Sequence, residues 1–383
     1  MSPSAYIKSG IYVSFFIYVF LAFLDVPLNV PGFNYIVVSL LFFISLSGIV
    51  IFNTVNVKDI IFSIFALSLG IGGYFSATIS VGALFPFFYL LLWAVMFSFI
   101  RKIKPEKQDI IDLLKNAFYF YLLVSIVSFI LFKSHYRAFS FDGFFLDRAF
   151  HGVEGSPANI DTFCTVFFLA ALMSDTYSLQ QKIFHFIVFF LVVYFCGTTT
   201  PFLILLTVIG YLLIKYFIKL HARRTTVLGI YAVMLAMFYF SIHSEIIYQF
   251  LLLATNGRNY IWNEQIFNVF SNFSIQDLFF GNFSNAYVPI HWSSEDTNNP
   301  HNGYLFMLIR LGFVVTFGFF AYSLIVVEKI SNFQFVILIS LLAASVSNSN
   351  VFYLSNPIMT LVLVYSILPI QGAKHEKYST LLR

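Results

Sequence analysis

Apolar runs of about the length that crosses a lipid bilayer recur along the whole chain, and they constrain the fold more than any other feature. A transmembrane helix needs roughly 20 mostly apolar residues. We expect an all-α polytopic membrane protein with about twelve transmembrane helices, forming a single transmembrane domain over residues 1–383. The predicted spans are 10–27, 33–52, 59–75, 79–100, 115–132, 158–174, 183–198, 200–218, 225–242, 303–327, 333–349 and 356–370.

The chain carries too few charged residues to cover a water-soluble globule. Only 10% of its 383 residues are charged, whereas soluble domains carry roughly 25%. No basic stripe alternates with exposed aromatic residues, so we expect no nucleic-acid partner. The two cysteines, Cys164 and Cys196, fall in or at the ends of apolar runs and form neither a disulfide framework nor a metal motif. The expected surroundings of the chain are membrane lipid.

Lysine and arginine residues favour one side of this arrangement. With a cytoplasmic N-terminus, the segments on the inner side contain sixteen of the 21 Lys and Arg residues. The positive-inside rule predicts this bias, and one missed or invented span would spoil it. We therefore expect a multi-pass inner-membrane protein with both termini in the cytoplasm.

Two predicted outer segments are long enough to carry function. One is a periplasmic loop at 133–157, and the other is a large periplasmic loop at 243–302, before the tenth span. Within the large loop, residues 258–270 have the pattern of an amphipathic helix, with Trp262 and Ile266 on the apolar face. This helix either lies in the outer membrane interface or packs on the spans.

Ionisable residues on the predicted outer side are the candidates for chemistry. Arg148 and Arg258 lie near the membrane ends of their loops, and Arg310 lies about two turns into the tenth span. Arginine binds phosphate through paired, charge-assisted hydrogen bonds, although each residue could equally snorkel or form a structural ion pair. His301, at the mouth of the tenth span, could accept a proton or could simply cap the helix. His301 can face one cavity with Arg310 only if it precedes the helix, which Pro300 and Gly303 favour.

Three segments resemble the bacterial superfamily of O-antigen polymerases (Wzy-type) and O-antigen ligases. Each segment combines an arginine or histidine with nearby helix-start or glycine residues. They are Arg148 with Pro157-Ala158-Asn159, Gly257-Arg258 with Trp262 and Leu278-Phe279-Phe280-Gly281, and His301-Asn302-Gly303-Tyr304-Leu305 with Arg310-Leu311-Gly312. One segment departs from the family, because Gly197-Thr198-Thr199-Thr200-Pro201 stands where many members have a Ser-x-Ser-Arg-like stretch. One possible phosphate contact is therefore unaccounted for.

The resemblance implies a membrane glycosyltransferase that polymerises undecaprenyl-pyrophosphate-linked O-antigen, or related surface polysaccharide, repeat units on the periplasmic face. The resemblance implies catalytic roles for His301, Arg258 and Arg148, with Arg148, Arg258, Arg310 and Asn302 binding the pyrophosphate or glycan. It implies no cofactor and no metal, and it leaves open a chain-length regulator protein as a partner.

Two other functions stay open. An O-antigen ligase would transfer the glycan to lipid A–core instead of to another lipid-linked repeat unit. A flippase for lipid-linked oligosaccharide would need charged residues through several spans and matched halves, and the sequence has neither pattern.

Overall fold

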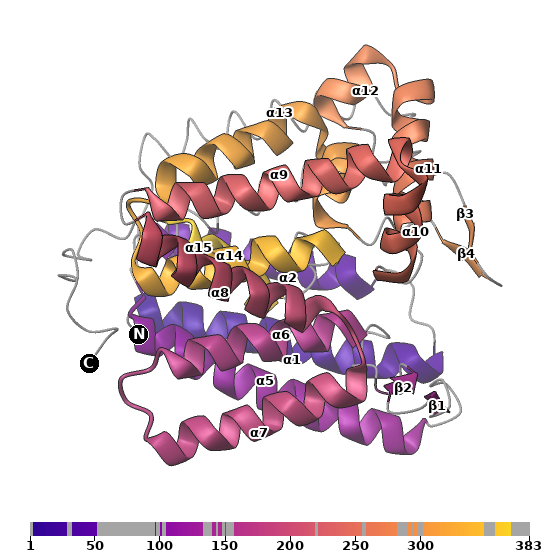
Figure 1. Ribbon diagram of the computed structural model, residues 1–383. Coiled ribbons are helices and arrows are strands. Elements are labelled where there is room, and N and C mark those ends of the chain that lie inside the picture. Colours follow the sequence, from indigo (N-terminus) through magenta and orange to yellow (C-terminus); the bar gives the residue numbers. More distant parts are fainter. Residues whose placement is uncertain are drawn as a thin grey trace.

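The computed structural model describes residues 3–28, 33–51, 96, 100–101, 105–132, 140–142, 145–147, 150, 157–218, 221–254, 258–281, 290–292, 295–297, 302–347 and 357–368. Helices dominate this part of the chain (Figure 1). They are α1 (Pro3–Leu28), α2 (Phe33–Ile51), α5 (Lys107–Leu131), α6 (Pro157–Leu172), α7 (Leu179–Cys196), α8 (Thr200–Phe217), α9 (Ala222–His243), α10 (Glu245–Ala254), α11 (Arg258–Asn272), α12 (Ile275–Phe280), α13 (Gly303–Val326), α14 (Asn332–Ser347) and α15 (Pro357–Ser366).

The helices match the apolar pattern of the sequence closely. Ten of the twelve predicted spans overlap one described helix each. The other two predicted spans, 59–75 and 79–100, lie outside the described residues except for Met96 and Ile100. Five described helices, α5, α7, α8, α9 and α13, are long and apolar enough to cross a membrane. Three shorter apolar helical stretches, Ser9–Asp25, Asn159–Leu172 and Asn332–Ser347, accompany them. The protein therefore has the character of a multi-pass membrane protein.

Helix α5 begins eight residues earlier than the predicted span at 115. The predicted span leaves out the charged residues before 115, but the helix includes residues 107–114, with Asp109 in its first turn. Lys107 at its beginning donates a 2.8 Å hydrogen bond to Asp175, in the connection between α6 and α7. A span predicted from hydropathy thus marks the apolar part of a helix and not its ends.

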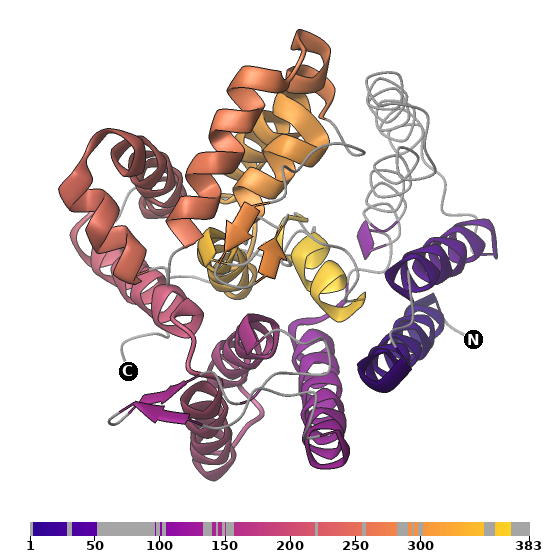
Figure 2. The same ribbon diagram turned by 90° about the vertical axis from the view of Figure 1, so that its right-hand side faces the viewer.

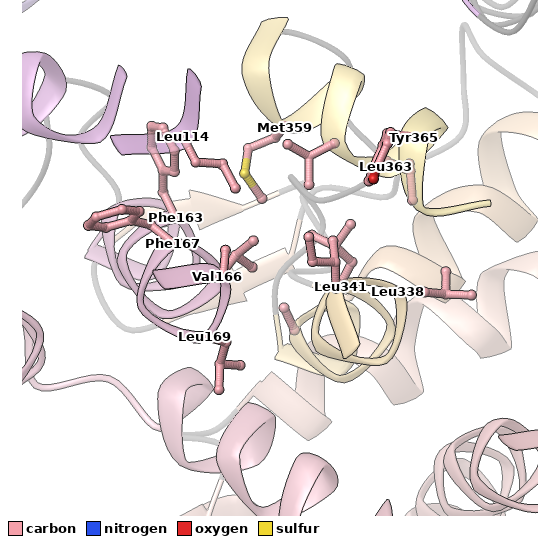
Figure 3. Packing of buried hydrophobic residues seen from close by; sticks show 14 of the residues in the cluster. Leu114, Phe163, Val166, Phe167, Leu169, Leu338, Leu341, Met359, Leu363 and Tyr365 are labelled. Carbon is pink, nitrogen blue, oxygen red and sulfur yellow. The ribbon is translucent and has the colours of Figure 1, made fainter. Parts of the chain in front are cut away.

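Helix α14 forms the centre of the bundle. It contacts α6, α8, α9, α13 and α15, and nearly all of its side chains are buried. Its sequence is apolar on all sides, which is the pattern of a helix without a water-facing surface. Leu338 and Leu341 of α14 lie near Val166 of α6 and Leu363 of α15 in the core (Figure 3).

Hydrogen bonds between helices connect this apolar core. In lipid, contacts between helices depend on close packing and on such polar links. Tyr231 of α9 bonds Ser323 of α13 at 2.7 Å, and the Tyr304 hydroxyl donates to the Leu342 carbonyl at 2.7 Å. The Gln334 amide of α14 donates to the Tyr365 and Leu368 carbonyls at 2.7 and 2.8 Å, which satisfies the end of α15.

The loops gather at one end of the bundle, which we call the loop-bearing end. It holds α10, α11, α12 and two hairpins (Figure 1). The hairpins were not predicted from the sequence. Strand β1 (Ser140–Asp142) pairs antiparallel with β2 (Phe145–Asp147), and β3 (Ile290–Trp292) pairs with β4 (Glu295–Thr297). Figure 2 looks onto this end, where β2 contacts α7 and β3 contacts α11.

At the end of the bundle opposite the loop-bearing end, Arg223 links α9 to the connection between α13 and α14. From α9, its guanidinium donates to the Val327 and Ile330 carbonyls at 2.9 and 2.7 Å, and to the Asn332 side chain at 2.7 Å. These acceptors form the connection between α13 and α14, so one side chain satisfies carbonyls left over at the end of α13.

Arg223→Ala is expected to lower the free energy of unfolding by about 3 kcal/mol, because hydrogen bonds from a charged donor to partly buried carbonyls are lost. The matched control is Arg224→Ala. Arg224 is more exposed and only lies 3.8 Å from Glu328, so its loss should cost less than about 1 kcal/mol. Thermal unfolding of the purified protein in detergent measures both, and equal shifts would contradict the role assigned to Arg223.

Candidate functional site

The three segments singled out in the sequence meet the bundle at the loop-bearing end. Helix α6 begins there at Pro157, α11 begins at Arg258, and α13 begins at Gly303. Helix α8 also begins there, at Thr200, after a short turn that starts with the left-handed cap residue Gly197 of α7. The predicted spans 183–198 and 200–218 leave only one residue between them, and they therefore imply this tight turn.

Helix α11 covers the outer halves of α9 and α13. The predicted helix is present, and the Trp262 side chain is only 1% exposed. Trp262 and Val269 pack in one cluster with Leu305 and Ile309 of α13, and the ring of Phe238 from α9 lies edge-on to Trp262. The apolar face of α11 is therefore covered by protein, which is the second of the two arrangements that the sequence allowed.

Part of the polar face of α11 is also buried. In the helical pattern of the sequence, Asn259 and Asn263 lie away from the apolar face that carries Trp262 and Ile266. They still contact protein: the amide of Asn259 donates to the Tyr248 carbonyl of α10 at 3.2 Å, and that of Asn263 donates to the Ser241 carbonyl of α9 at 3.1 Å. Both asparagines thus bond backbone carbonyls of neighbouring helices, and the Ser241 carbonyl lies in the last turn of α9.

Tyr248, whose carbonyl accepts from Asn259, also carries a phenol hydroxyl. Its partial burial raises the pKa of the Tyr248 hydroxyl, and the nearby acidic side chains Glu245 and Glu264 raise the pKa further. The hydroxyl therefore stays protonated near neutral pH and can donate a hydrogen bond.

The beginning of α13 is fixed by Asn302. Its side-chain oxygen accepts from the Leu305 N–H at 3.0 Å, and its amide donates to the Val346 carbonyl of α14 at 2.8 Å. This side chain is 0% exposed, and its oxygen and its amide nitrogen both bond backbone groups. Asn302 caps a helix that begins at Gly303, so His301 precedes the helix, as the sequence predicted.

A chain of polar contacts links the other helix ends to Asn302. The Thr200 hydroxyl, at the beginning of α8, bonds the Ser347 hydroxyl of α14 at 2.9 Å. Ser347 follows Val346, whose carbonyl accepts from Asn302. The turn between α7 and α8, the end of α14 and the beginning of α13 therefore form one connected unit.

Asp161 adds a buried carboxyl group to this unit, and sequence reasoning missed it. Asp161 lies in the first half of α6 and is 0% exposed. One of its oxygens accepts from the Thr198 hydroxyl, and the Cys196 thiol is a second neighbour. Its other oxygen has no hydrogen-bond partner among the described residues. The signal in the sequence is the position of Asp161 inside the predicted span 158–174, because an ionisable residue within an apolar span is itself a candidate functional residue.

Helix α13 is interrupted next to Arg310. Gly312 has φ 73° and ψ 178°, which is far from helical, and the last residues of α12 lie against this interruption. Arg310, two residues before Gly312, is partly buried in the half of α13 nearest the loop-bearing end. The break brings Arg310 next to α12 of the large loop.

The structure describes the remaining predicted site residues only in part. Arg258 is the first residue of α11, but its side chain lies outside the described part. Arg148 and His301 also lie outside the described residues. Phe150, two residues after Arg148, donates its backbone N–H to the Phe195 carbonyl of α7 at 3.1 Å. This bond fixes the chain beside Cys196, which borders Asp161.

The arrangement offers hydrogen-bond donors and several helix N-termini at one end of an apolar bundle, which suits an anionic group at a membrane surface. No group of three His, Cys, Asp or Glu side chains that could hold a metal occurs among the residues described. Comparisons with family models, with curated proteins and with solved structures find no match for this chain.

Thr198→Val is expected to lower the free energy of unfolding by about 1–3 kcal/mol, because it leaves the buried Asp161 carboxyl without its hydroxyl donor. Thr199→Val is the matched control, since Thr199 is exposed and makes no side-chain cap bond. Thermal unfolding in detergent compares the two variants. A loss as large for Thr199→Val as for Thr198→Val would contradict the role of this bond.

Proposed function

We propose that the protein is a glycosyltransferase of a bacterial inner membrane, of the O-antigen polymerase type. It would join undecaprenyl-pyrophosphate-linked repeat units of O-antigen, or of a related surface polysaccharide, on the periplasmic face. The proposal rests on the resemblance of three segments to that family, and the meeting of those segments at the loop-bearing end supports it.

The contacts between these segments are the observation that carries the proposal. Thr198 links α6 to the beginning of α8, and Thr200 and Asn302 continue the connection through α14 to α13. Trp262 of α11 packs against α13, and Gly281 lies against the backbone of Arg310. Segments separated by more than a hundred residues in the sequence thus belong to one structural unit.

The proposed reaction is a displacement at the anomeric carbon of the donor glycan. A hydroxyl of the acceptor sugar forms the new glycosidic bond, and the bond to the lipid pyrophosphate breaks. The acceptor proton goes to His301, acting as general base, and the pyrophosphate leaves with the electron pair. Arg148 and Arg258, with Arg310 as a further contact, would stabilise the charge that builds on the leaving group. Each contact of this kind can contribute about 10²–10³-fold in rate.

The membrane arrangement is part of the same proposal. About twelve spans would place both termini in the cytoplasm, with 133–157 and 243–302 in the periplasm. The loop-bearing end would then face the periplasm, where the lipid-linked donor is presented. Arg223 would lie on the cytoplasmic side, together with most of the chain's lysine and arginine residues.

The distribution of charge favours an enzyme over a flippase. Asp161 and Arg310 lie in the halves of α6 and α13 that are nearest the loop-bearing end. A transporter for a charged lipid headgroup needs polar groups along a route through the membrane centre. A ligase would use the same donor chemistry, so the acceptor has to be determined by experiment.

The lipopolysaccharide banding pattern of a deletion strain tests the proposal. The deletion is expected to leave a single band of core plus one repeat unit, and wild-type protein should restore the ladder. Arg258→Ala and His301→Ala, expressed at wild-type levels, should fail to restore it, because they lose leaving-group stabilisation and proton transfer. His291→Ala, in β3 of the same loop, is the matched control and should restore the ladder.

Other banding patterns would change the assignment. Core without any repeat unit, while lipid-linked polymer accumulates, would identify a ligase. Lipid-linked precursor retained on the cytoplasmic side would identify a flippase. A normal ladder in the deletion strain would contradict both glycosyltransferase functions.

Reporter fusions test the orientation. Alkaline phosphatase fused after Asp142 or Trp292, at the ends of β1 and β3, should be active because both sites would be periplasmic. Fusions after Thr176 or Ile330, in the connections before α7 and α14, should be inactive, and fluorescent-protein fusions should give the opposite pattern. Phosphatase activity after Thr176 would contradict the predicted orientation of α6 and α7.

A further inference from the structure

The end of α12 meets the interruption of α13 through two glycines. A Cβ atom at Gly281 would lie 2.5 Å from the carbonyl carbon of Arg310 and 2.7 Å from the amide nitrogen of Leu311. A Cβ atom at Gly312 would lie 2.5 Å from the Gly281 nitrogen and 2.6 Å from the carbonyl carbon of Phe279. Each glycine therefore contacts backbone from the other segment, and neither side has a flexible side chain that could move aside.

The backbone at both positions also requires glycine. Gly281 has φ 82° and ψ 161°, and Gly312 has φ 73° and ψ 178°. Other residues rarely adopt this region, at a cost of order 1–3 kcal/mol each. Two such positions in direct contact show that α13 is interrupted where α12 lies against it.

Helix α12 links the glycine contact to the apolar cluster around Trp262. Ser274 and Asp277 form a capping box at its beginning, and the Asp277 carbonyl accepts from the Gly281 N–H at its end. Leu278 packs against the cluster of Trp262, Leu305 and Ile309. Helices α11 and α12 therefore contact the outer half of α13 together.

Arg310 lies directly at this contact. Its carbonyl carbon is one of the atoms nearest to the position of a Gly281 side chain, and the break at Gly312 follows two residues later. A shift of α12 away from α13 would therefore move the backbone that carries the Arg310 side chain.

We propose that Gly281 and Gly312 are positioning residues for the transfer reaction. Their contact holds the large loop on α13 and sets the direction of the Arg310 side chain toward the pyrophosphate of the lipid-linked donor. The role of the glycines in catalysis rests on the proposed function, whereas their role in docking α12 does not.

Docking is tested first, without substrate. In a variant with Trp262 as its only tryptophan (Trp93→Phe and Trp292→Phe), Gly281→Ala and Gly312→Ala should shift the Trp262 fluorescence to longer wavelength. The shift is expected because displacing α12 removes Leu278 from the cluster that buries Trp262. Gly318→Ala is the matched control, because Gly318 lies in the same helix with open space where its Cβ would be. An unchanged spectrum in both glycine variants would overturn the docking.

Positioning is tested with lipid-linked repeat units extracted from the deletion strain. Gly281→Ala should lower the rate of chain extension by about 10²-fold, the size of effect expected when a catalytic group is misplaced by about 1 Å. In an Arg310→Ala background, the same substitution should change the rate less than about twofold, because the group that it positions is already absent. Gly318→Ala should leave the rate unchanged in both backgrounds.

Gly281→Ala combined with Gly312→Ala should be no slower than either single variant, since both disrupt one contact. Equal losses from Gly281→Ala with and without Arg310 would show a general structural role and would overturn the inference, as would full activity of Arg310→Ala.

Leu278→Ala provides a second route, because it loosens α12 without altering either glycine. If none of the three variants folds, the glycines serve folding and the inference is wrong. A wild-type protein that extends no chain would refute the proposed function, while the fluorescence would still test the docking.

Discussion

The burial of α14 on every side is the constraint on which the loop-bearing end depends. This helix contacts α6, α8, α9, α13 and α15, and polar groups near its two ends bond the ends of neighbouring helices. Gln334 holds the end of α15, while Ser347 and the Val346 carbonyl hold the beginnings of α8 and α13. Because these bonds form inside an apolar environment, each one fixes a helix end with little competition from water. The large loop ends at one of these fixed ends, the beginning of α13.

The helices could be predicted from the sequence because hydropathy acts locally. Ten spans, the turn at Gly197 and the helix beginning at Arg258 all follow from short windows of residues. The early beginning of α5 could not be predicted in this way, because charged residues end an apolar window without ending a helix. The two hairpins were missed for a similar reason, since three-residue strands leave too short a pattern to recognise.

The contacts of the site were much less predictable. Asn302 was interpreted as a binding residue, yet both ends of its amide serve the fold. The hydrogen bond between Thr198 and Asp161 joins residues 37 positions apart, and the glycine contact joins α12 to α13. No pattern within one segment indicates such partners. Gly281 and Gly312 each belong to a stretch on which the family resemblance rests, but their contact with each other could not be predicted from either stretch.

The central position of α14 also affects how the chain can be assembled. Helices of a membrane protein first form individually in the bilayer and then associate. In the order of synthesis, α6, α8, α9 and α13 all precede the helix that they finally surround. Until residue 347 has been made, the Thr200 hydroxyl and the Asn302 amide lack their α14 partners. The loop-bearing end is therefore completed late in biosynthesis, when the penultimate described helix enters a space bounded by helices made before it.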